Sequence, residues 1–378
     1  MRRFLALTAA LLTAAALAAP SALADSIVYE KGGNVWLARP DGTGAHQITS
    51  SGRYTNPSQA DDGTIAAVKG GLLQRLSRSG RLLNLAGDSS GSGPLLSSIS
   101  PAGSLIAYHY TNTGSITPGL RTAISEAGRE TSNDEIFNIG GWINPSWIGD
   151  ARLLMFDGSP TFTGDTLIYT VGGSGTQTWY EDPALSLSGG EIDQSQTRFS
   201  ATDGSTIRLY RLSAPPPAIA VEPRCDVTGG TGSFFRPTWS PDGSTLAWQE
   251  DDGIHTMPVN LDTCVGQSEL AVPGGRAPDW GPAAPGAALS ATAPKRIALA
   301  ALLRGMTVKV RCTCRAVASL YLGKKLVGRA GKRVTVSGRV KVKPSRAGRA
   351  RLEAGGNSVK LKLSGAGTTV TRKVKIVR

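Results

Sequence analysis

The chain has 378 residues, a formal net charge of +13, 40% apolar residues and 6% aromatic residues. Such a length gives one large or two moderate domains, and the apolar content is ample for a hydrophobic core. The 47 glycines and 22 prolines indicate many turns, and no long amphipathic helical pattern follows the first 25 residues. These features exclude a mostly helical protein, and we expect a nearly all-β chain.

The first 24 residues have the pattern of a signal peptide. Arg2 and Arg3 precede an apolar run over residues 4–19, and residues 22–24 (Ala-Leu-Ala) form a small-x-small cleavage site. That run is short for a membrane span, and no second hydrophobic span follows. We expect cleavage before Asp25 and an exported protein that is extracellular, cell wall-associated or periplasmic.

A recurring phrase organises residues 25–282. In its best-formed copy, residues 235–248 have the sequence FRPTWSPDGSTLAW. Within it, residues 240–243 (Ser-Pro-Asp-Gly) fit a type I turn, because serine suits the first position, proline the second and glycine the fourth. Since β-forming residues flank the turn on both sides, the phrase predicts a strand, a tight turn and a second strand.

Further copies of the phrase align on the position of Trp239. The aligned positions are Gln59, Ile99, Trp147, Ser200, Trp239 and Trp280, with residues 198–207 as the copy around Ser200. A period of about 40–50 residues with several short strands per unit is typical of propeller blades, which cover each other's faces by packing radially.

The two ends of this array complement each other. The copy at Trp280 has an inner strand and no outer strands after it, whereas residues 26–50 supply three strands that lack an inner one. We therefore expect a six-bladed β-propeller over residues 25–282, in which one blade is shared between both ends of the array.

Two stretches carry a resemblance to a known repeat. Residues 240–248 (SPDGSTLAW) and 34–49 (NVWLARPDGTGAHQIT) resemble the TolB-type propeller repeat, which is related to WD-like repeats. The resemblance implies a propeller, a fold that occurs in binding scaffolds and in domains attached to peptidases. Because no α/β-hydrolase domain follows the repeats, the peptidase interpretation is removed.

The charge changes abruptly after residues 283–294, which we interpret as a Pro/Ala/Gly linker. Residues 295–378, called here the basic region, hold 23 lysines and arginines and one acid, Glu353. Valine alternates with lysine in several stretches, such as residues 340–343 and 359–363, which predicts strands with an apolar and a charged face. We expect a small Ig-like β-sandwich, loosely similar to basic β-sandwich modules that end many secreted actinobacterial proteins.

The unbalanced charge of the basic region favours a polyanionic partner. Such a field attracts anionic cell-wall polymer or a membrane surface, although a charged face often serves solubility alone. Specific nucleic-acid recognition is not expected, because Tyr321 is the one aromatic residue of the region and stacking platforms are therefore lacking. The candidate polyanion-binding residues are Lys309, Lys324, Lys325, Lys341, Lys343, Lys360, Lys362 and Lys375.

The four cysteines fit an oxidising compartment. Cys225 and Cys264 flank the best-formed repeat, so we favour a disulfide between them that closes the outer edge of its blade. For Cys312 and Cys314 a structural bridge or two free thiols is favoured over a redox pair. A metal site there is disfavoured, because no histidine or second cysteine pair lies nearby.

We find no catalytic constellation in the sequence. None of His46, His109 and His255 has a nucleophile with a fixed role nearby, so we expect no catalytic, cofactor or metal site. The main hypothesis is a non-enzymatic binding scaffold whose propeller loops bind a protein or glycan and whose basic region binds an anionic envelope surface. The alternative is a secreted propeller carbohydrate hydrolase or lyase that uses acidic loop residues. Its candidate residues are Asp134, Glu135, Asp251 and Asp252.

Overall fold

The structure is a computed structural model. It describes residues 25–87, 93–112, 119–130, 137–158, 164–173, 175–264, 266–285, 290–311, 314–334, 337–365 and 368–378. Within these ranges, no helix has the length and apolar character needed to cross a bilayer. The predicted signal peptide lies outside the described residues.

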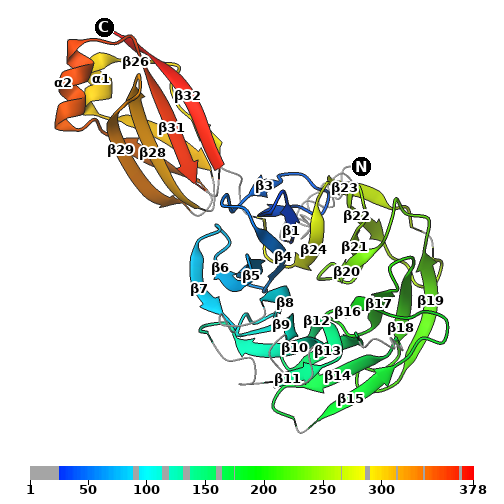
Figure 1. The fold of residues 1–378 in the computed structure, drawn as a ribbon. Helices are drawn as coiled ribbons and strands as arrows, with labels where there is room; N and C mark the ends of the chain where they lie inside the picture. The colour runs from blue at the N-terminus through cyan, green and yellow to red at the C-terminus, as the bar shows by residue number, and fades with distance from the viewer. Residues whose placement is uncertain are drawn as a thin grey trace, which may run out of the picture.

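Six four-stranded antiparallel sheets form a ring, as Figure 1 shows, with one strand of each sheet nearest the centre. The first complete sheet contains β4 (Tyr54–Gln59), β5 (Ile65–Lys69), β6 (Leu72–Leu76) and β7 (Leu82–Ala86). The next contains β8 (Pro94–Ile99), β9 (Leu105–Asn112), β10 (Gly119–Glu126) and β11 (Phe137–Gly140). The third contains β12 (Trp142–Ile148), β13 (Arg152–Asp157), β14 (Thr166–Thr170) and β15 (Thr176–Tyr180).

Two more sheets follow in chain order, and a last one joins both ends of the ring. They contain β16 (Gly189–Ile192), β17 (Arg198–Thr202), β18 (Ile207–Leu212) and β19 (Val221–Val227), then β20 (Phe235–Trp239), β21 (Thr245–Gln249), β22 (Gly253–Pro258) and β23 (Glu269–Pro273). The closing sheet has the order β24 (Arg276–Gly281), β1 (Ser26–Lys31), β2 (Asn34–Ala38) and β3 (His46–Gln47). The expected six blades and the shared closing blade are confirmed.

One predicted repeat was wrong by one strand. The sequence alignment put Ser200 at an inner strand, but Ser200 lies on β17, the second strand of its sheet, and the inner strand is β16. The turn between β16 and β17 has the sequence Asp-Gln-Ser-Gln, with Gln196 at a φ of 57° where other copies have glycine. The next turn, between β17 and β18, contains Asp203-Gly204 and so resembles the turn of the best-formed repeat. It was therefore taken for the repeat, and the turn between β16 and β17 was missed.

The aligned tryptophan connects neighbouring blades. The indole Nε1 of Trp147 donates to the carbonyl of Ser98 at 2.9 Å, and that of Trp239 donates to the carbonyl of Glu191 at 3.2 Å. Each acceptor belongs to the inner strand of the preceding blade. At these two positions the tryptophan side chain both fills the space between two sheets and bonds across it.

The hydrophobic core of the ring lies between neighbouring sheets. Phe156 and Ile168 of one sheet, for example, pack in a single cluster with Phe199 and Tyr210 of the next. Each sheet therefore buries both faces through its neighbours, which holds the inner strands, and the side chains between them, in fixed positions.

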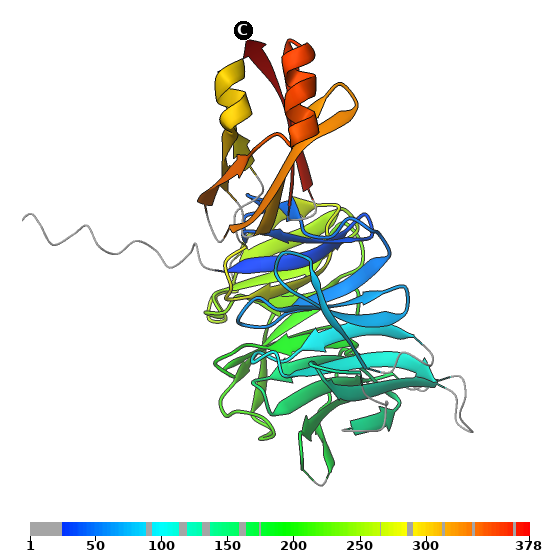
Figure 2. The same ribbon diagram turned by 90° about the vertical axis from the view of Figure 1, so that its left-hand side faces the viewer.

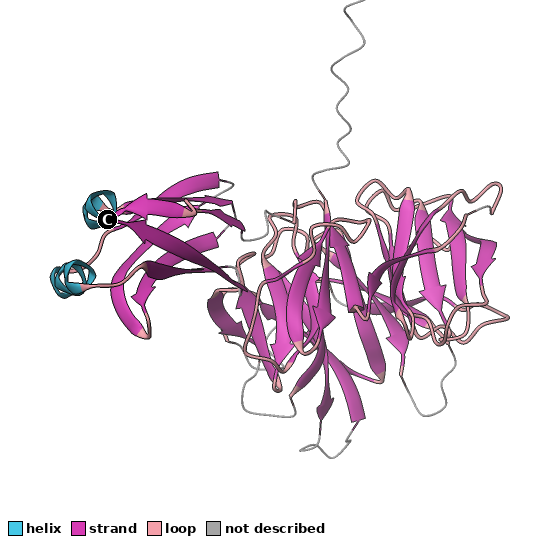
Figure 3. Cartoon of the chain, turned by 90° about the horizontal axis from the view of Figure 1, so that it is seen from above, coloured by secondary structure: helices cyan, strands magenta, loops and turns pink. Residues whose placement is uncertain are grey.

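The basic region forms two sheets and two helices over a single core of its own. One sheet has the order β25 (Ser290–Thr292), β27 (Met306–Arg311) and β30 (Ser337–Val342). The other has the order β26 (Arg296–Ala298), β32 (Thr368–Val377), β31 (Ser358–Gly365), β28 (Cys314–Leu322) and β29 (Lys325–Val334). Figures 2 and 3 show this region beside the ring, with both helices at its far end.

Some features of the basic region were not predicted. Helix α1 (Leu299–Arg304) and helix α2 (Arg346–Ala354) place Leu302 and Leu352 in the core, and the side chain of Ser345 caps α2. These helices are too short to give a periodic sequence signal. Strand β25 lies inside the predicted linker, because it pairs with β27 and extends the smaller sheet. The immunoglobulin-like topology stays a prediction.

Candidate functional site

The inner strands of the propeller surround a central channel that contains two hollows. One hollow, of about 420 Å³, includes Arg236, and we call it the Arg236 end. The other, of about 250 Å³, includes Asp61. The two hollows share four residues, which mark the middle of the channel: Ser98, Ser146, Glu191 and Asp279.

The Arg236 end is shaped by bulges in the inner strands. Four residues that precede a proline have positive φ values between 47° and 49°: Asn56, Asn144, Arg236 and Ala277. The strand registers shift at these positions, as expected where proline cannot donate to the sheet. Because all four residues line the Arg236 end, the bulges place the Asn, Arg and Ala side chains at the channel opening.

Three ionisable side chains face one another in the channel. Burial raises the pKa of Glu191 to about 8, and the neighbouring Asp279 carboxylate raises it further while hydrogen bonds oppose the change. Burial also raises the pKa of Asp279 to about 6, against the attraction of Arg236. Burial lowers the pKa of Arg236, although both carboxyls oppose this. Near neutral pH, Glu191 is therefore largely protonated while Arg236 and Asp279 balance each other.

These groups are held by the surrounding backbone. The amide of Trp239 donates to Glu191 Oε1 at 3.2 Å, and the amide of Gln59 donates to Asp279 Oδ2 at 2.6 Å. The guanidinium of Arg236 donates to Asn56 Oδ1 at 3.3 Å. The channel thus presents fixed donors and acceptors with little net charge, an arrangement suited to a polar ligand.

An exposed apolar side chain borders the same opening. Phe235 lines the Arg236 end and is 47% exposed. Leu95 is 45% exposed, and its carbonyl accepts a hydrogen bond from Asn56 Nδ2 at 2.7 Å. An exposed aromatic ring beside a polar hollow suits a ligand with both apolar and polar faces, such as a sugar or a peptide.

None of the described residues that line the Arg236 end is histidine or cysteine. His109 lies behind this lining, where its Nδ1 accepts a hydrogen bond from the Asn144 amide at 3.3 Å. Burial, and secondarily the charge of Arg236, lowers the pKa of His109 to about 4. His109 is therefore neutral at ordinary pH and acts as an acceptor that supports the bulge at Asn144.

The other histidines lie away from the channel. His46 is buried, and its Nδ1 lies 3.0 Å from the carbonyl of Gly44. His255 stacks on Trp248, and its Nε2 lies 2.7 Å from Asp252 Oδ1. Of the acidic candidates for the carbohydrate enzyme, Asp251 and Asp252 follow β21 outside the channel lining, and Asp134 and Glu135 lie outside the described residues.

Potential metal-ligating atoms of Glu250, Asp252 and His255 lie within 4.8 Å of one another. The Glu250 carboxylate already accepts hydrogen bonds from Trp248 Nε1 at 2.8 Å and from the Thr231 amide at 2.6 Å. Asp252 Oδ1 in turn lies 2.7 Å from His255 Nε2, and the buried His255 Nδ1 is the one ring nitrogen of the cluster without a hydrogen-bond partner. We therefore interpret the cluster as a structural hydrogen-bond network.

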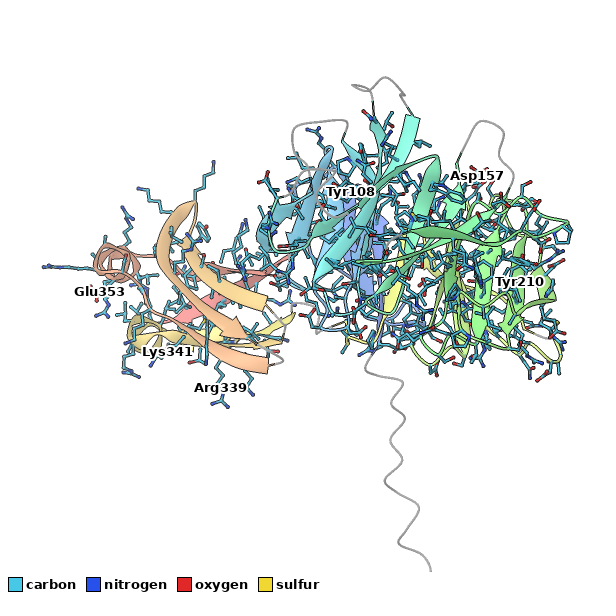
Figure 4. All side chains as sticks on the ribbon, turned by 90° about the horizontal axis from the view of Figure 1, so that it is seen from below. Tyr108, Asp157, Tyr210, Arg339, Lys341 and Glu353 are labelled. Carbon is cyan, nitrogen blue, oxygen red and sulfur yellow. A yellow bond between two sulfur atoms is a disulfide. The ribbon has the colours of Figure 1, made fainter. Side chains whose placement is uncertain are left out.

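The basic region exposes its lysines. All eight candidates are exposed: Lys309, Lys324, Lys325, Lys341, Lys343, Lys360, Lys362 and Lys375. They lie on both sheets and on the turn between β28 and β29, while the alternating apolar residues are buried. Figure 4 shows Arg339 and Lys341 on the smaller sheet and Glu353 on α2. The predicted alternation of charged and apolar faces is present, and polyanion binding stays a proposal.

The disulfide favoured from the sequence is present. Cys225 on β19 is bonded to Cys264, with 5.5 Å between their Cα atoms. It joins β19, the outer strand of the fourth sheet, to the loop after β22, so it bridges two blades instead of closing the edge of one. Cys312 and the side chain of Cys314 lie outside what the structure describes.

The channel residues were not predicted from the sequence. Arg236 and Asp279 lie inside copies of the repeat that the sequence identifies. Predicting a strand at each copy does not show that their side chains face a common centre. Glu191 was missed because its inner strand was assigned to the wrong segment. The signal that was available is the Xaa-Pro pair two residues before the aligned position, which marks a bulge at the channel opening.

No protein-family model matches the sequence, and no curated protein matches it. Solved propellers show a likeness of fold at low identity. TolB from Acinetobacter baumannii is 15% identical, with 68% of this chain and 66% of that chain covered and a TM-score of 0.46. A gluconolactonase from Xanthomonas campestris is 10% identical, with 59% and 78% covered and a TM-score of 0.44. A chain of the nidogen–laminin complex is 11% identical, with 68% and 97% covered and a TM-score of 0.49.

Proposed function

We propose that this protein is an exported, non-enzymatic binding scaffold. Its propeller binds a protein or glycan partner at the Arg236 end of the channel, and its basic region binds an anionic envelope surface. The observation that supports this most is the polar hollow of about 420 Å³, bordered by the exposed ring of Phe235. Fixed polar groups with an exposed aromatic anchor are what a binding site needs.

The two parts of the proposal have different electrostatics, so one experiment can separate them. The immobilised chain from Asp25 to Arg378 is exposed to an envelope extract, and bound material is eluted first with salt and then with denaturant. Partners of the basic region elute with salt, because exposed charges are screened. Partners of the channel should resist salt better, because Arg236 and the two carboxyls are partly buried and salt screens such groups less than exposed ones.

Variants identify the surface that each partner uses. Phe235→Ser removes the aromatic border of the channel and should abolish the salt-resistant fraction alone. Leu82→Ser, which changes another exposed apolar side chain away from the channel lining, serves as the control. Equal retention by both variants would remove the channel from the proposal.

A carbohydrate hydrolase or lyase is the second candidate, and one observation supports it. Glu191 and Asp279 are carboxyls with raised pKa values in a channel, as a general acid requires. Polysaccharide degradation by the chain, lost in Glu191→Gln and retained in Asp252→Asn, would favour the enzyme. Absence of turnover across neutral and acidic polysaccharides would favour the scaffold.

A further inference from the structure

The five-stranded sheet of the basic region carries its cations in register on one face. Strand pairing places Lys360 opposite Lys373 and Arg296 opposite Lys375. Lys362 points to the same face as Lys360, because alternate residues of a strand share a face. All five side chains are exposed. The residues that alternate with them are buried: Val359, Leu361, Val374 and Ile376.

This arrangement destabilises the isolated sheet. Like charges directly opposite each other on neighbouring strands repel. The one acid of the region, Glu353, lies on α2, and the salt bridges found among the described residues all lie in the propeller. The repulsion is thus uncompensated within the described chain, as is typical of a surface that is neutralised by a ligand.

The spacing of the lysines indicates the kind of anion. Alternate side chains along a strand are about 6.5 Å apart. The number of backbone bonds between the Cα atoms of two such residues equals the number of bonds between neighbouring phosphorus atoms in a glycerol phosphate chain. The spacing of the lysines and the spacing of the phosphates are therefore similar when both chains are extended. An acidic polysaccharide instead places at least one rigid sugar ring between successive carboxylates.

The neighbours of the lysines suit phosphate and not nucleobases. Strand register places Thr371 and Ser319 on either side of Lys362, and the exposed Thr371 adds a hydroxyl donor beside its charge. Tyr321, opposite Lys360, is the sole aromatic residue of the basic region. A nucleic acid would need several aromatic platforms for its bases, whereas a polyol phosphate needs none.

We propose that the outer face of the five-stranded sheet binds a linear polyol-phosphate polymer along β31 and β32. Successive phosphates lie on Lys360 and Lys362 of β31 and on Lys373 and Lys375 of β32, with Lys373 directly opposite Lys360. This inference rests on the proposed function, since it names the polymer and the sheet through which the basic region would bind an anionic surface.

The test measures binding of poly(glycerol phosphate) to the chain from Asp25 to Arg378 by titration at low and at physiological salt. Lys360→Thr with Lys362→Thr should weaken binding roughly thirtyfold, if each lysine contributes as it does near an anionic surface. The matched control is Lys309→Thr with Lys341→Thr, which removes the same charge from the smaller sheet. The control should weaken binding by less than about threefold, through the long-range field alone.

A second pair guards against effects on folding. Lys373→Thr with Lys375→Thr should reproduce the loss, and both pairs on the five-stranded sheet should keep or raise the Tm without polymer, because each removes repulsion. Equal losses from the five-stranded and smaller sheets would overturn the site but leave the proposed function standing. Equal or tighter binding of single-stranded DNA or polygalacturonate would overturn the polyol-phosphate assignment. No binding of any polyanion at low salt would remove both.

Discussion

Gln59 bonds to Asp279 across the point where the propeller closes. The amide of Gln59 donates to Asp279 Oδ2 at 2.6 Å, and its side-chain Nε2 donates to the carbonyl of Asp279 at 2.9 Å. The same Nε2 lies 2.8 Å from the carbonyl of Ser26, and Arg78 donates to Gln59 Oε1 at 3.0 Å. Gln59 thus does for the closing blade what Trp147 and Trp239 do elsewhere, with an amide in place of an indole.

The first prediction concerns this connection. Gln59→Met keeps the length of the side chain but leaves the carbonyls of Asp279 and Ser26 without its amide donor. Each unsatisfied buried group costs about 1–3 kcal/mol, so the free energy of unfolding should fall by roughly that amount or more. Urea denaturation would measure the change. Gln194→Met, at an exposed turn, should have no effect, and a similar loss there would contradict the role of Gln59.

A second prediction concerns pH. Because the pKa of Glu191 is raised to about 8 in the folded chain, the folded state binds a proton that the unfolded state releases at lower pH. This contribution to stability is complete below the unfolded pKa and is lost as the pH rises to about 8. Glu191→Gln should therefore flatten the fall in Tm between about pH 5 and pH 8.

Thermal melts of both proteins across that range would check the Glu191 prediction. Glu269→Gln, on the exposed end of β23, is the matched control and should melt like the unchanged chain at each pH. Parallel profiles for the unchanged chain and Glu191→Gln would mean that Glu191 is ionised throughout.

A third prediction concerns the disulfide. Cys225 and Cys264 close a loop of 39 residues, and a bridge of that size stabilises a fold by roughly 2–4 kcal/mol. A reductant should lower the Tm of the chain, and Cys225→Ala with Cys264→Ala should melt near the reduced protein. If reductant lowers the Tm of this double variant just as much, another bridge is responsible.

A fourth prediction concerns the network around Glu250. Glu250→Ala leaves Trp248 Nε1 and the Thr231 amide without their acceptor, and the loss of stability should be about 1–3 kcal/mol for each donor that water cannot reach. EDTA should leave the Tm of the unchanged chain where it is, because hydrogen bonds and not a metal hold the network. A fall in Tm on chelation, reversed by zinc, would show the opposite.

The sequence by itself determined the architecture of the ring. A tight turn after the aligned position recurs at intervals of about 40–50 residues because blades share the same inner hairpin, and Ser-Pro-Asp-Gly at residues 240–243 is its best-formed copy. The disulfide and the alternation of lysine with valine were also predictable. The pairing was suggested by the positions of the two cysteines on either side of one repeat, and the alternation follows from the two-residue period of a strand. The repeat around Ser200 was assigned to the wrong strand because two successive turns of that blade begin with aspartate. The second of them, Asp203-Gly204, has the Asp-Gly pair of the best-formed repeat, whereas the first has Asp-Gln.

The tertiary structure alone decided which residues share the channel. Glu191, Arg236 and Asp279 come from three different inner strands, and nothing local to any of them reveals that closure of the ring turns them toward a common axis. Their raised or lowered pKa values arise mainly from burial, which only the closed ring provides. The opposition of Lys360 and Lys373 likewise depends on strand register, which a one-dimensional pattern does not contain.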